Sequence, residues 1–287
     1  MAMDTSIAAP IGLFLNSSSG NGKGSAIAHK LTGSLDGRGI DYILFKDSWP
    51  TDPGAISAAW IIGGDGTVNY YLNHYRENKF PIAVFPAGTG NDIHAELYGS
   101  CTLEEQVERI LHATIRKIDL GSCNDKVYIN SSGIGFDGEV LKSMGAIRTF
   151  GGHLGYLAVV VKNIFSYKEP FFHIKADGNN LDGSYLLCSI NNSTRTGGGF
   201  IISPKAMLDD KLLDLVLCNA LPVWKRLRYL PVIEKGKHTT LPFIKYLQAS
   251  SIVVSCDKTL WGQLDGELIQ GTEFHFKVIP AALGVLA

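Results

Sequence analysis

The stretch Gly63-Gly64-Asp65-Gly66-Thr67 follows the apolar run Trp60-Ile61-Ile62 and precedes a predicted helix that starts near Val68. A turn of such small residues lets backbone N–H groups approach an anionic ligand, and the N-terminus of the following helix adds positive charge. The stretch is therefore typical of a phosphate-binding loop. The same glycines also suit a tight turn between a strand and a helix, and the stretch alone does not decide between the two.

Two further glycine-rich loops follow short apolar runs in the N-terminal half. They are residues 16–24 (NSSSGNGKG) and residues 86–92 (PAGTGND). The apolar runs predict strands at residues 11–15, 41–46, 58–62 and 81–85. In an open, Rossmann-like α/β sheet such loops meet at the carboxyl ends of the strands, where ligands bind. The N-terminal half is thus predicted to be a nucleotide-binding α/β domain.

The second half of the chain has a different pattern. Residues 102–112 predict a capped surface helix, and Asn124-Asp125 predicts a hairpin turn that leads into a strand at residues 127–130. Two helices are expected at residues 137–144 and 154–165, followed by short apolar runs between turn clusters. Such punctuation favours an antiparallel, β-rich, sandwich-like domain. We place the domains at residues 1–122 and 123–287, with the last few residues packing back on the first domain.

The sequence argues against two classes of protein: a broadly basic nucleic-acid binder and a protein with a segment that spans a bilayer. The 287 residues are 45% hydrophobic and 18% charged with a net charge of -1, so the chain is no broadly basic nucleic-acid binder. No uncharged apolar run of about 18 or more residues occurs, and the N-terminal apolar run lacks a basic leader. The five cysteines are scattered and form no zinc spacing. We expect a cytoplasmic protein with reduced thiols, soluble or peripheral at a membrane.

Taken together, the motifs resemble the diacylglycerol kinase catalytic-domain family, which includes bacterial lipid kinases and the sphingosine and ceramide kinases. The matching pieces are residues 16–23, 63–69 (GGDGTVN), 86–92 (PAGTGND), 119–121 (DLG), 133–137 (GIGFD), 197–199 (GGG) and 265–267 (DGE). The first loop motif alone is shared with NAD kinases and phosphofructokinases. The second loop, followed much later by D-G-E, points to the lipid kinases.

The resemblance implies an ATP- and Mg²⁺-dependent lipid kinase, most similar to enzymes that convert diacylglycerol to phosphatidic acid. It implies an N-terminal nucleotide-binding domain, a C-terminal acceptor domain, and reaction in the cleft between them. The nucleotide-binding residues that it implies are Asn16, Gly63, Gly64, Asp65, Gly66, Thr67, Val68, Asn69, Gly88, Thr89 and Gly90. The implied partners are ATP and a lipid at a membrane surface, with no nucleic acid, and a homodimer is compatible with the family.

Phosphoryl transfer to an alcohol needs cationic charge near the phosphates and a carboxylate that takes the hydroxyl proton. Spacing alone does not choose among the candidates Asp65, Asp92, Asp119, Asp137, Asp265 and Glu267. By resemblance, Glu267 is the general base and Asp265 lies beside it in the cleft, although Asp265-Gly266 also suits an ordinary β-turn. Asp65 is expected to order the phosphate loop or help to hold magnesium, or to cap a helix.

A structural magnesium site is implied near residues 204–214. By resemblance its ligands are the Asp210 side chain and the carbonyls of Met207 and Leu212. Lys211 stands where the family has glycine, which puts the site in question because lysine adopts a positive φ at greater cost and brings positive charge. The alternative is a solvated acidic turn.

Residues 222–246 carry six basic residues and one acid, interleaved with aromatic and aliphatic residues. The segment is either a docking site for anionic headgroups or an amphipathic helix packed on the second domain. Residues 197–200 and 154–165 are alternative places for an acyl chain. Two other functions remain open: a kinase for a soluble metabolite, of the NAD kinase type, and a non-catalytic nucleotide-binding regulator.

Overall fold

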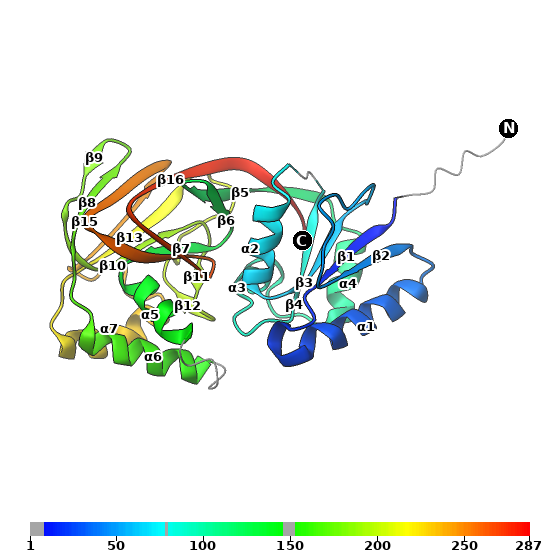
Figure 1. Cartoon of the computed structure of the whole chain (residues 1–287), viewed down its shortest axis with the longest axis horizontal. Helices are drawn as coiled ribbons and strands as arrows, with labels where there is room; N and C mark the ends of the chain where they lie inside the picture. The colour runs from blue at the N-terminus through cyan, green and yellow to red at the C-terminus, as the bar shows by residue number, and fades with distance from the viewer. Residues whose placement is uncertain (1–8, 78–79, 146–152) are drawn as a thin grey trace.

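The structure is a computed structural model that describes residues 9–77, 80–145 and 153–287 (Figure 1). Its N-terminal half is a parallel sheet with strand order β4-β3-β1-β2. The strands are β1 (Ile11–Leu15), β2 (Tyr42–Lys46), β3 (Ala59–Gly63) and β4 (Ile82–Pro86). The helical elements are the short 3-10 turn η1 (Ser19–Gly22), α1 (Lys23–Asp36), α2 (Asp65–His74), α3 (Asp92–Tyr98) and α4 (Leu103–Leu111). Residues 59–63 of β3 and all of β1 are buried, which explains their continuous apolar sequences.

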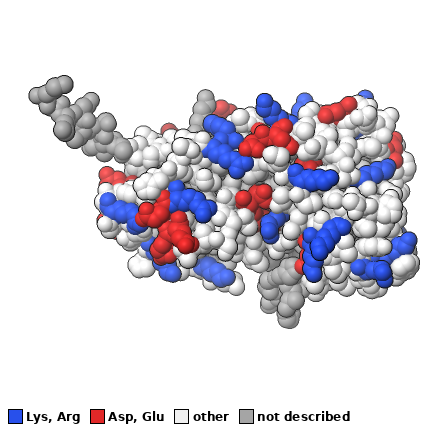
Figure 2. Space-filling model, turned by 180° about the vertical axis from the view of Figure 1, so that it is seen from behind, with Lys and Arg blue, Asp and Glu red and all other residues white. Residues whose placement is uncertain are grey.

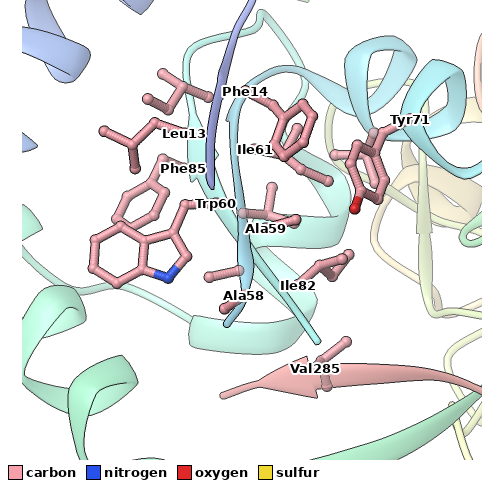
Figure 3. Packing of buried hydrophobic residues seen from close by; sticks show 14 of the residues in the cluster. Leu13, Phe14, Ala58, Ala59, Trp60, Ile61, Tyr71, Ile82, Phe85 and Val285 are labelled. Carbon is pink, nitrogen blue, oxygen red and sulfur yellow. The ribbon is translucent and has the colours of Figure 1, made fainter. Parts of the chain in front are cut away.

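Aromatic side chains fill the core of this half (Figure 3). The ring centroids of Trp60 and Phe85 lie 5.1 Å apart, and those of Phe14 and Tyr71 lie 5.0 Å apart. Burying each such ring contributes roughly 1.5–3 kcal/mol, so the core fixes where the strands end and where their loops begin. Val285, near the C-terminus, pairs with Ile82 of β4 and lies against the same core.

A long two-stranded ribbon joins the halves. Its strands are β5 (Ile115–Cys123) and β16 (Glu267–Leu286), paired antiparallel. The register shifts between Ile279 and Leu283, where Ala281 has a φ of 50° and donates its N–H to Asp119 Oδ1 at 2.7 Å. The bulge bends the ribbon, so β16 starts in the C-terminal sheet and ends in the N-terminal one.

The C-terminal half is a curled antiparallel sheet. Its other strands are β6 (Lys126–Tyr128), β7 (Ser131–Ile134), β8 (Phe171–Ala176), β9 (Asn179–Asn180), β10 (Gly183–Asn191), β13 (Leu213–Asn219), β14 (Ile244–Ala249) and β15 (Ser251–Leu264). β11 (Arg195–Thr196) and β12 (Phe200–Ile201) form a separate two-stranded antiparallel sheet. β8 pairs with both β10 and β15, and β7 also joins those two strands, so the strands curl into a sandwich-like arrangement. The predicted fold class is thereby confirmed.

Three helices cover one edge of this half: α5 (Phe136–Gly145), α6 (His153–Ser166) and α7 (Val223–Glu234). They pack around Val140, Val159, Val160 and Ile164. In the described part of the chain no helix is long and apolar enough to cross a membrane. The five cysteines are free, and four of them are buried.

Two predicted boundaries were wrong. The helix expected near Val68 begins at Asp65, because Gly64 O already accepts hydrogen bonds from the N–H groups of Thr67 and Val68. The strand expected at residues 127–130 ends at Tyr128. The amides of residues 129–131 instead donate to the carboxylate of Asp265, which replaces the pairing of a strand.

Candidate active site

Two of the predicted loops touch backbone to backbone. A Cβ atom built on Gly64 would lie 2.8 Å from the Cα atom of Gly88, and one built on Gly88 would lie 2.5 Å from the Cα atom of Gly64. Real Cβ atoms do not approach carbon atoms this closely, so both positions require glycine for space. The ends of β3 and β4 thus bring residues 63–67 and 86–92 into one site.

The loop after β1 joins the same site. Asn16 Nδ2 donates to Thr67 Oγ1 at 3.1 Å. A Cβ atom on Gly20, whose φ is 57°, would lie 2.0 Å from the carbonyl oxygen of Ala87. The structure therefore brings together all three glycine-rich loops that the sequence singled out, at the carboxyl edge of the sheet.

Asp65 caps a helix, although not its own. Its Oδ2 accepts the N–H of Asp92 at 3.1 Å and its Oδ1 accepts the N–H of Ile93 at 3.0 Å, both at the start of α3. Asn130 of the C-terminal half donates to Oδ1 at 3.3 Å. A carboxylate at a helix N-terminus is stabilised by these donors and by the helix dipole. Asp65 consequently ties residues 63–67 to residues 86–92 and to the other domain.

Asp92 makes a second link between the halves. Its Oδ2 accepts the N–H of Gly198 at 2.8 Å, and the carboxylate is buried. Burial and the nearby negative charge of Asp65 raise the pKa of Asp92 to about 6. Gly90 packs close to Gly198, so residues 197–199 from the C-terminal half close over the second loop.

The D-G-E turn is anchored by its first residue. Asp265 Oδ2 accepts hydrogen bonds from Asn69 Nδ2 and the N–H of Ile129, and its Oδ1 accepts the N–H groups of Asn130 and Ser131, at 2.8–3.1 Å. Burial raises the pKa of Asp265 to about 6, while these four donors act in the opposite direction. Asp265 is thus held by protein donors on both oxygens rather than standing open in the cleft.

Glu267 is exposed at the first position of β16. Its Oε1 lies 3.2 Å from the position that a Cβ atom on Gly66 would occupy. Two segments far apart in the sequence, the D-G-E turn and the GGDGT loop, therefore face each other, and a carboxylate stands directly over the start of α2.

Three other residues that the sequence predicted to bind nucleotide, Thr89, Val68 and Asn69, differ in their surroundings. Thr89 is exposed on the second loop. Val68 belongs to the core and is fully buried. Asn69 points its amide toward Val127 O and Asp265, and its own Oδ1 accepts from Asn73. The side chains of Val68 and Asn69 thus face the core and the domain contact rather than the loop.

Several polar residues at the domain contact, and others beside it within the C-terminal half, were not predicted. Ser193 donates to Asn130, Ser131 donates to Thr196, and Thr194 donates to Glu96 of α3. Asn192 donates to the carbonyls of Asp119 and Ile129, both at 2.9 Å. The only sequence signal was the polar cluster at residues 191–199, which also suits a turn between strands.

The proposed magnesium ligands lie in one turn. Asp210 accepts hydrogen bonds from Leu212 N–H at 3.0 Å and from Gln248 Nε2 at 2.9 Å, one on each oxygen, and the Met207 side chain is exposed. Lys211 has a φ of 65°, the left-handed conformation that a glycine would supply, and its N–H donates to Asp119 at 2.6 Å. Among the residues that the structure describes, no group of three or more His, Cys, Asp or Glu side chains gathers to hold a metal ion.

Lys211→Gly should therefore stabilise the fold. A left-handed φ costs a residue with a side chain about 1 kcal/mol relative to glycine, so the free energy of unfolding should rise by roughly that amount. Urea denaturation measures it. The matched control is Lys258→Gly in β15, where glycine should lower stability by about 0.5–1 kcal/mol. A loss of stability in both variants would show that contacts of the Lys211 side chain outweigh its backbone strain.

Asp137, in the first turn of α5, lies against the backbone of Gly133. Burial raises the pKa of the Asp137 carboxyl to about 7. Because this pKa lies above the unfolded value, the folded protein holds a proton that the unfolded chain releases between about pH 4 and 7. Its contribution to stability is present at low pH and is lost as the pH rises through this interval.

Asp137→Asn should remove this dependence. At about pH 8 the variant should be more stable than wild type by on the order of 4 kcal/mol, and near pH 4 the two should be equal. Urea titrations at both pH values measure the difference, with the exposed Asp125→Asn as the control. A variant that is less stable than wild type at the higher pH would contradict the assignment.

A cavity of about 620 Å³ lies at the far end of α2 and is lined in part by Pro53, His74, Tyr75 and Phe80. The GGDGT loop lies at the start of α2, so this cavity is at the opposite end of the helix from that loop. It does not form part of the candidate site.

Comparisons with known proteins agree with this architecture. Residues 10–123 match the diacylglycerol kinase catalytic domain, and residues 130–287 match the YegS C-terminal NAD kinase beta sandwich-like domain. A diacylglycerol kinase of Mycobacterium tuberculosis is 27% identical over 94% of this chain and 93% of its own length. A YegS-like protein of Shewanella frigidimarina, named a probable lipid kinase, is 27% identical over 78% of this chain and 74% of its own.

Among solved structures, a diacylglycerol kinase from Bacillus anthracis is similar with a TM-score of 0.71 at 18% identity, over 96% of each chain. At this identity the likeness shows the fold alone. The domain matches span both halves of the chain, and the second alone covers more than half of it. The resemblance inferred from the motifs is confirmed, and the chain belongs to the diacylglycerol kinase catalytic-domain family, with a YegS-type C-terminal domain.

Proposed function

We propose that the chain is an ATP-dependent lipid kinase that transfers the γ-phosphoryl group of ATP to a lipid hydroxyl, with diacylglycerol as the acceptor and phosphatidic acid as the product. The main support is the position of Glu267 Oε1, which faces Gly66 of the GGDGT loop. A base and a phosphate loop that meet across two domains are what phosphoryl transfer to an alcohol requires. The names of the relatives support the class of acceptor.

Residues 1–122 bind ATP in this proposal, and residues 123–287 shape the acceptor site. The triphosphate lies along residues 63–69 and 88–90, with Asn16 at its side. Glu267 takes the proton of the acceptor hydroxyl as the acceptor oxygen bonds to the γ-phosphorus. The bond from that phosphorus to the oxygen bridging it to the β-phosphate breaks, and ADP leaves. Asp265 and Asp65 act as positioning residues, because protein N–H groups occupy both oxygens of each carboxylate.

Mg²⁺ would supply positive charge that offsets the negative charge of the phosphates. We propose that this ion is held mainly by the triphosphate, since the described side chains form no cluster of three or more ligands. A separate structural magnesium is proposed at Asp210 with the carbonyls of Met207 and Leu212. The left-handed backbone of Lys211 supports it, because the turn keeps a conformation suited to glycine.

The magnesium proposal is tested by thermal unfolding with and without millimolar Mg²⁺ but without nucleotide. Wild type should melt at a higher temperature with the ion, and Asp210→Asn should lose this shift because it removes the charged ligand. Asp209→Asn, the exposed neighbour, is the control. An equal shift in wild type and Asp210→Asn would reject the site.

The proposed activity is tested with purified protein, ATP and separate acceptors: diacylglycerol, monoacylglycerol, sphingosine and NAD. Phosphorylation of diacylglycerol is the expected result. Preferential phosphorylation of NAD would instead establish a soluble-metabolite kinase, an outcome that the NAD kinase likeness of the C-terminal domain makes worth including. ATP binding with transfer to no acceptor would indicate a nucleotide-binding regulator.

A further inference from the structure

The helices α6 and α7 lie side by side along one edge of the C-terminal half (Figure 1). Their outward side chains include Lys162 and Phe165 of α6 and Trp224 and Arg228 of α7, and Lys235 directly follows α7; all five are exposed. We call these five residues the α6–α7 face. None of them has a place in the mechanism proposed above.

The outward residues follow helical spacing. Residues 224 and 228 of α7 are four positions apart, and residues 162 and 165 of α6 are three apart, so each pair lies on one side of its helix. The opposite sides are packed, with Val160 and Ile164 of α6 and Arg226 of α7 buried. Each helix therefore has one packed side and one exposed side.

The two aromatic side chains of this face are unusually exposed to solvent. Trp224 is 63% exposed and Phe165 is 62% exposed, and in the described residues no other large hydrophobic side chain is more exposed. Phe165 lies near the C-terminal end of α6 and Trp224 near the N-terminal end of α7, and the Arg226 side chain joins these two ends. Exposed aromatic side chains of this kind are favoured at the interface between water and a bilayer.

Positive charge surrounds the two aromatics although the whole chain has a net charge of -1. The cations on and beside the face are Lys162, Lys168, Lys225, Arg228, Lys235 and Lys237. The acids in the same segments are Glu169, which is paired with Arg226, and Glu234. Figure 2 shows Lys and Arg side chains along this lower edge of the C-terminal half. Such a surface is complementary to anionic headgroups.

Packing connects the face to the candidate site. Arg226 donates to the carbonyls of Ile164 and Tyr167 and so fixes the end of α6 on α7. The ring of Tyr167 packs against Phe136 at the start of α5, with centroids 5.4 Å apart. Only Gly135 separates Phe136 from β7, and the first residue of β7, Ser131, donates its N–H to Asp265. Any surface that binds to the α6–α7 face is therefore held at a fixed position relative to the D-G-E turn.

We propose that the α6–α7 face docks on a bilayer that contains anionic lipids, with Trp224 and Phe165 entering the interfacial layer and the surrounding cations contacting headgroups. The inference rests on the proposed function for its purpose, since a lipid acceptor must be reached at a membrane. It names the surface and the headgroup charge. A double-stranded nucleic acid would use the cations but not the two exposed aromatics, which is why we favour the bilayer.

The test is co-sedimentation of the full chain, without ATP, with vesicles of phosphatidylcholine alone or with about one-third phosphatidylglycerol. Wild type should bind the anionic vesicles at least tenfold more tightly than the neutral ones, and added salt should weaken the binding. Each cation near such a surface contributes about fivefold, so Arg228→Gln with Lys235→Gln should weaken binding by at least tenfold. Trp224→Ala with Phe165→Ala should weaken it similarly.

The matched controls are Lys30→Gln with Lys117→Gln, and Ile43→Ala, which remove exposed cations and an exposed hydrophobic from the N-terminal half. They should bind as wild type does, and circular dichroism should show all variants folded. Equal binding to neutral and anionic vesicles, no binding, or equal losses in the controls would overturn the proposal. So would tighter binding to double-stranded DNA than to the anionic vesicles.

The vesicle assay needs no phosphoryl transfer, so it remains informative if the kinase assay fails. Conversely, the aromatic double variant should keep the wild-type rate on a short-chain acceptor that is dissolved as monomers, and should lose at least fivefold in rate on anionic vesicles. A loss of equal size on both acceptors would reject docking by this face.

Discussion

Glu267→Gln should lower kcat for lipid phosphorylation by at least a hundredfold and leave the affinity for ATP nearly unchanged. A positioned general base contributes about 10²–10⁴ in rate, and the amide that replaces the carboxylate has similar size but accepts protons poorly. Glu267 is exposed on β16 and faces Gly66, so the substitution leaves the packing of the core as it is. The loss should appear in kcat and not in nucleotide binding.

Steady-state phosphorylation of diacylglycerol and titration with a fluorescent ATP analogue measure the two quantities separately. Glu273→Gln, an exposed glutamate on the same strand, is the matched control and should turn over as wild type does. If kcat of Glu267→Gln stayed within twofold of wild type, Glu267 would have no part in proton transfer.

Gly64→Ala should weaken ATP binding by at least tenfold and lower the free energy of unfolding by about 1–3 kcal/mol, the usual cost of overpacking. The added methyl carbon would stand 2.8 Å from the Cα atom of Gly88, and the atom that it meets belongs to a backbone rather than a movable side chain. The two loops must separate to admit it. Nucleotide titration and urea denaturation measure the effects.

The matched control is Gly33→Ala in α1, where a Cβ atom would meet nothing within 4 Å. Alanine favours a helix over glycine by about 0.5–1 kcal/mol, so this variant should be slightly more stable and bind ATP normally. Unchanged ATP affinity in Gly64→Ala would show that the contact between the two loops does not shape the nucleotide site.

The strands of the N-terminal sheet and their loops followed from the sequence because each signal is local. Continuous burial makes a strand uniformly apolar, as in residues 11–15, and small residues mark the turn that follows it. The capping box of Thr102 and Glu105 is equally local and was predicted with its helix. Such features depend on residues within a few positions of one another.

The contact between the two domains could not be predicted from the sequence, because the residues that form it are distant from one another in the chain. Nothing near Asp265 in the sequence indicates that its carboxylate binds the amides of residues 129–131 and the Asn69 side chain. Likewise Asp65 was expected to order the phosphate loop, to help to hold magnesium or to cap a helix, and nothing in the sequence indicated that the helix it caps is α3. Carboxylates that organise a fold and carboxylates that carry out chemistry look alike in sequence, and their hydrogen-bond partners separate them.

The central claim is that the facing GGDGT loop and Glu267 form a lipid kinase site, and transfer of radiolabelled γ-phosphate from ATP to a total lipid extract tests it most directly. Wild type should produce one main labelled lipid, identified as phosphatidic acid, and Glu267→Gln should produce at least a hundredfold less. No labelled lipid from wild-type protein that binds ATP, or equal labelling by Glu267→Gln, would contradict the claim.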